Sequence, residues 1–209
     1  MQEKKSFKEQ RIKEMAFAYY SIPEVRKAIF EFSQNRECIP RYYEVFGKRP
    51  DTFNYESDIL EQVKKGATSF HCSEELWQDP LEISNELSEQ EVNDLRIGWE
   101  LLLDIDSKYR EYSKICAQLL IELLEFHGIR KIGVKFSGSK GFHILVPWKA
   151  FPKEIYGQKT KNMFPEWPRI ICQYLTEIIQ PKLEEKIFEE NNLKELAKKT
   201  GKSEEDLMI

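Results

Sequence analysis

The feature that most constrains the fold is a largely apolar run, Ile97 to Asp106, which ends in two aspartates separated by one isoleucine. Such a short run is typical of a buried strand rather than a surface helix. Residues two apart on a strand point to the same face, so Asp104 and Asp106 are expected side by side, roughly 6–7 Å apart along the chain. The run therefore predicts a strand whose end presents paired carboxylates.

A helix and a hairpin are expected directly after this run. Apolar residues at helical spacing predict a helix over residues 108–126, with His127 and Gly128 as its stop. Branched and aromatic residues predict strands over residues 131–136 and 142–146, separated by the glycine-containing turn SGSKG. The order strand, helix, strand, strand predicts an α+β fold, with a small mixed or antiparallel sheet flanked by helices.

The other segments are expected to be mainly helical. One helix is predicted to begin near Pro23 and a short one to be capped by Asp58, while a strand is predicted over residues 67–70. A long helix is expected over about residues 169–199, with Pro181 beginning a new segment within it.

With 209 residues, the chain is long enough for one sizeable core. Residues 1–95 are expected to form a mainly helical N-terminal part and residues 96–209 the part that bears the functional motifs, within one continuous domain. The opening segment is charged, and no apolar run approaches the roughly 18 residues of a membrane span. These features predict a cytoplasmic protein without membrane contact.

Charge and cysteine content narrow the possible partners. The formal net charge of -4 excludes a global attraction to nucleic acid, so any such contact must be local. Residues 130–161 are strongly basic, because Glu154 is the only acid there. This stretch is either a solvent-exposed face or a surface that binds phosphates. Its basic residues are Arg130, Lys131, Lys135, Lys140, Lys149, Lys153, Lys159 and Lys161. The isolated cysteines Cys38, Cys72, Cys116 and Cys172 predict buried or half-buried thiols without disulfides or a zinc site.

Asp104 and Asp106 are the candidate metal ligands. Paired carboxylates can hold two Mg²⁺ or Mn²⁺ ions about 3.5–4 Å apart, the arrangement that polymerases use for in-line phosphoryl transfer. The alternative is a strand that ends and exposes its acids to water. Like charges at a buried strand end repel each other, which favours a bound cation.

The segment Ser137 to His143 is the second candidate site. Its glycines expose backbone N–H groups in a turn, where a phosphate binds well, and Lys140 adds positive charge. His143, on the following strand, can donate a hydrogen bond to a phosphate oxygen. A hairpin with polar residues at its tip is the alternative.

A strand ending in D-x-D, a helix and then S-G-x-K-G-x-H resembles the first two catalytic motifs of the archaeo-eukaryotic primase superfamily. This superfamily includes DNA primase small subunits and the polymerase domains of bacterial end-joining ligases. The segments Asn35 to Glu37 and Thr68 to His71 also resemble parts of primase small subunits. The similarities span about residues 20–150 and imply a primase-type catalytic core.

The resemblance implies a DNA primase catalytic subunit that synthesises primers on single-stranded DNA from nucleoside triphosphates, with a large subunit as partner. Asp104 and Asp106 would be catalytic and would hold Mg²⁺ or Mn²⁺. The alternative for Arg36 is a surface arginine paired with Glu37 or with another neighbouring acid. The nucleotide-binding residues implied are Ser137, Lys140, His143 and Arg36.

Three departures from the family pattern leave other functions open. Ser139 stands where eukaryotic small subunits carry a second basic residue, which is closer to the ligase-associated form, and the zinc-binding knob is missing. No convincing third catalytic aspartate follows residue 146. Asp206 is the only aspartate there, and its sequence surroundings indicate a solvated acid. We expect the chain to end before the strand that bears this ligand, so that catalysis is weak or absent. The alternatives are a repair or gap-filling polymerase and a non-catalytic nucleotide-binding module.

Overall fold

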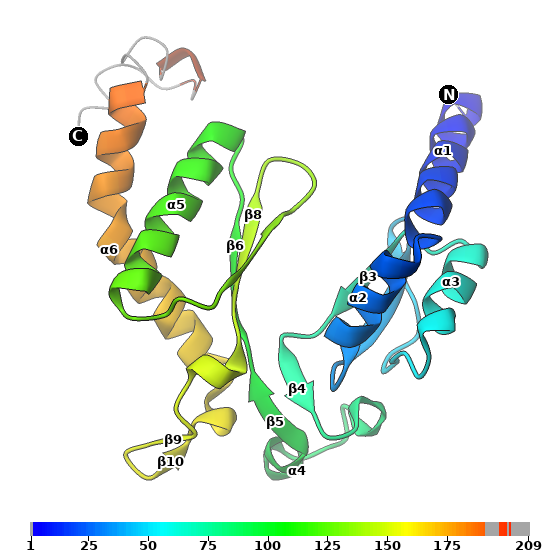
Figure 1. Cartoon of the computed structure of the whole chain (residues 1–209), viewed down its shortest axis with the longest axis horizontal. Coiled ribbons are helices and arrows are strands. Elements are labelled where there is room, and N and C mark those ends of the chain that lie inside the picture. Colours follow the sequence, from blue (N-terminus) through cyan, green and yellow to red (C-terminus); the bar gives the residue numbers. More distant parts are fainter. Residues whose placement is uncertain (1, 191–196, 200, 202–209) are drawn as a thin grey trace. The chain divides into compact units, whose positions relative to one another are not determined.

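Two compact units, residues 1–99 and 100–209, make up the chain (Figure 1). The structure, a computed structural model, describes residues 2–190, 197–199 and 201. Helices combine with small antiparallel sheets, so the expected α+β class is confirmed. The division between the units falls close to the expected change in character after residue 95.

Unit 1 contains a three-stranded antiparallel sheet of order β2-β1-β3, accompanied by helices α1, α2 and α3 that contact one another. Its core includes Cys38, Phe53 and Ile59, against which Phe30 and Phe70 pack. Burying each large apolar side chain stabilises the fold by about 1.5–3 kcal/mol. The elements are α1 (Gln2–Tyr20), α2 (Pro23–Ser33), β1 (Cys38–Tyr42), β2 (Val45–Phe46), α3 (Glu56–Lys64) and β3 (Ser69–Cys72).

An antiparallel pair of strands, β4 (Glu75–Trp77) and β5 (Arg96–Trp99), completes unit 1. The buried Arg96 forms an ion pair with Glu75 at 2.7 Å and lies over the Trp77 ring. The short helices η1 (Pro80–Glu82) and α4 (Glu89–Leu95) lie between the two strands in sequence.

Unit 2 contains the antiparallel sheet of order β6-β8-β7, packed against α5 and α6 (Figure 1). Alternate residues of β6 face the helices, and Leu103 there lies opposite the fully buried Ile144 of β8. Leu119 and Leu120 of α5 are buried as well, which confirms the expected apolar helix face. The main elements are β6 (Leu101–Ile105), α5 (Arg110–Phe126), β7 (Gly133–Phe136), β8 (Phe142–Val146) and α6 (Glu166–Glu190).

Short elements connect β8 to α6. A two-stranded antiparallel ribbon, β9 with β10, is flanked by two 3₁₀ helices. Their bounds are η2 (Trp148–Ala150), β9 (Glu154–Ile155), β10 (Gln158–Lys159) and η3 (Thr160–Met163). Within the described part of the chain, every helix is too short or too polar to span a lipid bilayer.

Three expectations about individual elements are corrected. The apolar run is two strands, β5 and β6, which separate at Glu100 and pair with different partners, β4 and β8. Asp58 is not an N-cap: it is the third residue of α3, where its carboxylate accepts from the Tyr55 and Asn54 N–H groups at 2.8 and 2.9 Å. Pro181 lies inside α6, which continues through it to Glu190. Residues 191–196 of the predicted helix lie outside the described residues.

Candidate functional site

Strand pairing brings Asp104, His143 and Lys135 into one row across the sheet of unit 2. Asp104 of β6 lies opposite His143 of β8, and Lys135 of β7 lies opposite His143 from the other side. Directly opposed residues of antiparallel strands project to the same face. His143 Nε2 lies 3.3 Å from Asp104 Oδ1. The two motifs singled out in the sequence therefore meet in space.

Asp104 lies on the exposed face of β6, and Asp106 directly follows the last residue of this strand. Leu103 and Ile105 are buried, whereas Asp104 and Asp106 are exposed. The side chain of Asp104 is 67% exposed. Both acids are therefore accessible to solvent, and the argument that repulsion at a buried strand end favours a bound cation does not apply.

The turn between β7 and β8 packs tightly on the end of β6. The Ser137 N–H donates to the Gly141 carbonyl at 3.0 Å, and Gly138 adopts a φ of 98°. A Cβ atom on Gly141 would overlap the Ile105 carbonyl oxygen and lie 3.0 Å from Ser137 Oγ. Only a glycine lets the turn come this close to the strand end that carries Asp106.

The groups expected to contact phosphate are accessible at this turn. Ser137 and Lys140 are exposed, and His143 is half-buried beside Asp104. An ammonium, a hydroxyl and an imidazole beside a glycine turn can donate hydrogen bonds to a polyphosphate. The sheet end thus brings exposed carboxylate oxygens close to groups that can donate hydrogen bonds.

Arg36 lies in unit 1 and is buried, with 4% of its surface exposed, so it is not the surface arginine considered as an alternative. Its guanidinium donates to the carbonyls of Phe32 and Ser73 at 2.8 and 2.9 Å and lies over the Phe32 ring. The adjacent Glu37 accepts two hydrogen bonds from Arg49, at 2.9 and 2.5 Å. These contacts tie Arg36 and Glu37 into the structure of unit 1.

The carboxylates of Asp104 and Asp106 supply hard oxygen ligands of the kind that Mg²⁺ and Mn²⁺ prefer. Among the described residues, no three or more His, Cys, Asp or Glu side chains converge into a metal site. Asp206 lies outside the described residues. Asp104 and Asp106 are thus the candidate ligands in the described part of the chain, and a cation there would need further oxygens from a nucleotide or water.

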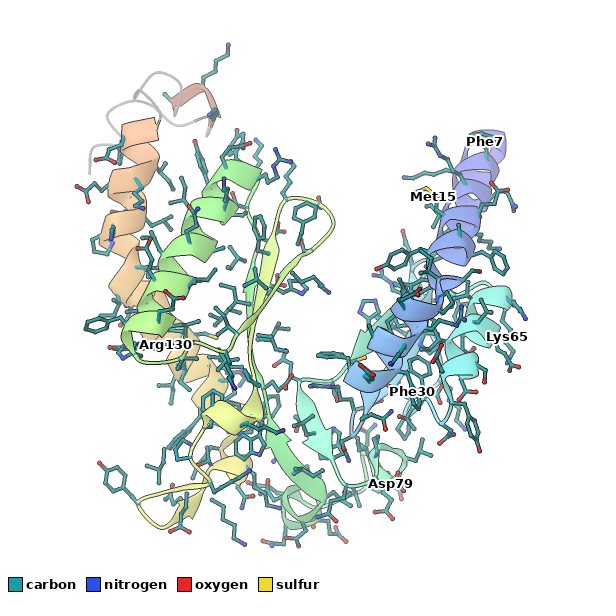
Figure 2. The ribbon with its side chains drawn as sticks, viewed as in Figure 1. Phe7, Met15, Phe30, Lys65, Asp79 and Arg130 are labelled. Atoms are coloured by element: carbon teal, nitrogen blue, oxygen red, sulfur yellow. The ribbon has the colours of Figure 1, made fainter. Side chains whose placement is uncertain are left out.

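The basic segment, residues 130–161, contains β7, the glycine turn and β8. Most of its basic side chains are exposed. Lys135 lies on β7, Lys149 on η2 and Lys159 on β10, all at the surface, whereas Lys161 is half-buried. Arg130 follows α5 (Figure 2). Lys153 Nζ lies 4.9 Å from the centre of the Trp148 ring, which engages that charge in a cation–π contact.

No protein-family model matches the chain. A protein of Methanocaldococcus jannaschii described as uncharacterized is 30% identical to it over 122 residues, which is 58% of this chain. The match covers 26% of that protein, so the chain spans about a quarter of its relative's length. The relative's description brings no activity, substrate or partner to this chain.

Proposed function

We propose that this chain carries the catalytic core of a DNA primase small subunit, which joins nucleotides into primers on single-stranded DNA. The observation that carries the proposal is the contact between Asp104 and His143, at 3.3 Å across paired strands. It places the D-x-D strand end beside the histidine of the glycine turn. A nucleotidyltransferase needs this proximity, because the cation-binding acids and the triphosphate-binding groups act on the same phosphates.

In this proposal Asp104 and Asp106 hold Mg²⁺ or Mn²⁺ at the sheet end. A bound divalent ion neutralises phosphate charge and lowers the pKa of an attacking hydroxyl. His143, whose Nε2 contacts Asp104, orients this carboxylate. The exposure of both acids leaves room for a nucleotide to complete the ligand set.

Lys140 and Ser137 bind the triphosphate in the same proposal. Both lie on the exposed turn whose Gly141 packs on the end of β6, so bound phosphates lie near the two acids. The exposed lysines of the basic segment contact the backbone of the DNA template, in a salt-dependent manner. A primase large subunit is the proposed partner of the whole protein.

One observation favours a second candidate, a nucleotide-binding module without catalysis. Among the described residues, no third acidic side chain joins Asp104 and Asp106. Two carboxylates hold paired metal ions less firmly than three, so the triphosphate can bind while transfer does not follow. Primer synthesis and nucleotide binding must therefore be measured separately.

The test combines primer synthesis on single-stranded DNA with labelled nucleotides and Mn²⁺ with titration of a fluorescent nucleoside triphosphate. We expect Asp104→Asn and Asp106→Asn to reduce synthesis by about 100-fold or more, because cation binding is lost. Lys140→Ala weakens triphosphate binding. Matched controls in unit 2 are Glu125→Gln and Lys114→Ala, exposed residues of α5 that should change neither measurement.

Each combination of results has a defined meaning. Synthesis that depends on the two aspartates supports the primase proposal, and a requirement for a 5′-phosphate at a DNA end redirects it to a gap-filling polymerase. Metal-dependent triphosphate binding without synthesis supports the binding module. Absence of both overturns the assignment of this site.

A further inference from the structure

Two thiols of unit 1 lie in contact across paired strands. The β1–β3 register places Cys38 directly opposite Cys72, although they are 34 positions apart in the sequence. Their Sγ atoms are 2.7 Å apart, compared with roughly 2.05 Å in a disulfide bond, so the two free thiols are in contact without being bonded. Neither the metal site nor the phosphate site proposed above includes these residues.

The backbone around this pair has the geometry that a disulfide needs. The Cys38 N–H donates to the Asp51 carbonyl at 2.8 Å, and in the neighbouring pair the Ser73 N–H donates to the Glu37 carbonyl at 2.9 Å. Cys38 and Cys72 therefore form a non-hydrogen-bonded pair of the antiparallel ladder. In such pairs the Cα atoms lie about 4.5 Å apart, within the 4.4–6.8 Å range that disulfides span.

The two thiols differ in access to solvent. Cys38 is completely buried in the unit 1 core, where Phe30 of α2, labelled in Figure 2, packs against it. Cys72 is only half-buried. The contact with Cys72 and burial raise the pKa of the Cys38 thiol, which disfavours its thiolate form. Cys72 is consequently the sulfur that an oxidant in solution reaches first.

We propose that Cys38 and Cys72 are a redox-active pair that a disulfide oxidant of the glutathione type joins into a disulfide between β1 and β3. The Cys72 thiolate attacks one sulfur of the oxidant and releases one glutathione thiolate. Cys38 then loses its proton to that thiolate and attacks the Cys72 sulfur, releasing the second glutathione. Two S–H bonds and the oxidant's S–S bond are broken, and one protein disulfide and two glutathione thiols are formed.

The test treats the folded chain with glutathione disulfide and counts thiols after denaturation under conditions that stop exchange. The count is expected to fall from four to two, with Cys38 and Cys72 joined in a non-reducing peptide map and an intact mass lower by about 2 Da. Reductant restores all four thiols. The matched control Cys116→Ser retains the cross-link, whereas Cys72→Ser abolishes it.

Thermal unfolding provides an independent measurement. A disulfide closing a loop of this length is expected to raise the midpoint of unfolding of unit 1 by about 10 °C, reversibly on reduction. Cys72→Ser shows no such rise under the same oxidant. A mixed disulfide with glutathione that persists on Cys72, or cross-links only between molecules, would overturn the proposal.

Discussion

Gly141 is the residue at which the turn of the candidate site comes closest to the strand that bears the aspartates. We expect Gly141→Ala to destabilise the protein by about 1–3 kcal/mol, because its methyl group would overlap the Ile105 carbonyl and displace the turn. Triphosphate binding should weaken as well. Urea unfolding and nucleotide titration measure the two effects.

Gly133→Ala is the matched control for this substitution. A Cβ there would lie 3.6 Å from the Leu145 Cβ, which is ordinary contact, so the free energy of unfolding should change by less than about 0.5 kcal/mol. Equal losses at Gly133 and Gly141 would contradict the role assigned to the close approach at Ile105.

Glu37 is a nearly buried acid whose carboxylate is paired with Arg49. Its side chain is 8% exposed and accepts two hydrogen bonds from Arg49, which is itself 66% exposed. This contact raises the pKa of Arg49. Arg49→Ala is expected to lower the free energy of unfolding by about 1–3 kcal/mol, because it leaves the carboxylate desolvated and unpaired.

The neighbouring Lys48→Ala separates this effect from a general loss of positive charge. Lys48 is exposed, so its removal should change stability by less than about 0.5 kcal/mol in chemical denaturation. Restoration of stability in the double variant Arg49→Ala with Glu37→Gln would support the explanation. No restoration would show that the lost packing of Arg49 matters more.

The site residues could be named from the sequence because each has a chemically distinctive side chain at a fixed spacing. The alternation along β6 is consistent with the exposure of Asp104 between the buried Leu103 and Ile105. The contact of Asp104 with His143 could not be predicted from the local sequence, because it depends on the pairing of β6 with β8. The burial of Arg36 depends likewise on Ser73, far away in the sequence.

At the scale of elements, β1 was missed because Pro40 lies within it. Proline lacks the N–H group that a central strand normally donates. The Pro40 carbonyl accepts from the Gly47 N–H at 2.8 Å, and Gly47 already lies beyond the end of the short β2. No residue of β2 therefore needs a hydrogen bond from the N–H group that Pro40 lacks. The division of the apolar run at Glu100 was missed for another reason. Strands β5 and β6 are both largely apolar and differ only in the strands with which they pair.

The first turn of helix α4 contains hydrogen bonds between Ser88 and Glu91 that make the stability of the fold depend on pH. The Glu91 carboxylate accepts from the Ser88 hydroxyl and N–H at 2.6 and 2.8 Å, and these bonds lower the pKa of Glu91. A depressed pKa in the folded state stabilises the fold above the ordinary value of 4.5, and this stabilisation is lost as the pH falls through the depressed value.

Glu91→Gln should therefore be less stable than the unchanged protein above pH 4.5, with a difference that shrinks at lower pH. Urea unfolding over a pH series measures the difference. Glu89→Gln, an exposed acid of the same first turn, provides the control for charge at a helix start. If the difference in the free energy of unfolding between Glu91→Gln and the unchanged protein stays constant with pH, the hydrogen bonds of the Glu91 carboxylate do not stabilise the fold.

At the scale of the whole molecule, each unit has a hydrophobic core of its own. Ile59 belongs to the core of unit 1, and Ile144 to the buried face of the unit 2 sheet; both are 0% exposed. The sequence predicted a mainly helical part up to residue 95, although four strands, β1 to β4, precede that point. It could not indicate which residues are buried in each unit, because burial depends on which elements pack together.

Separate cores predict that each unit opens as its own cooperative segment. Ile59→Ala and Ile144→Ala each leave a cavity that costs about 2–5 kcal/mol. In amide hydrogen exchange followed by mass spectrometry, we expect Ile59→Ala to increase exchange first in β1 and β3, and Ile144→Ala first in β6 and β8. Equal increases in both units from either substitution would instead show that the chain unfolds as one cooperative whole. The distinction bears on the candidate site, because all of its acids and turn residues belong to the unit that Ile144 stabilises.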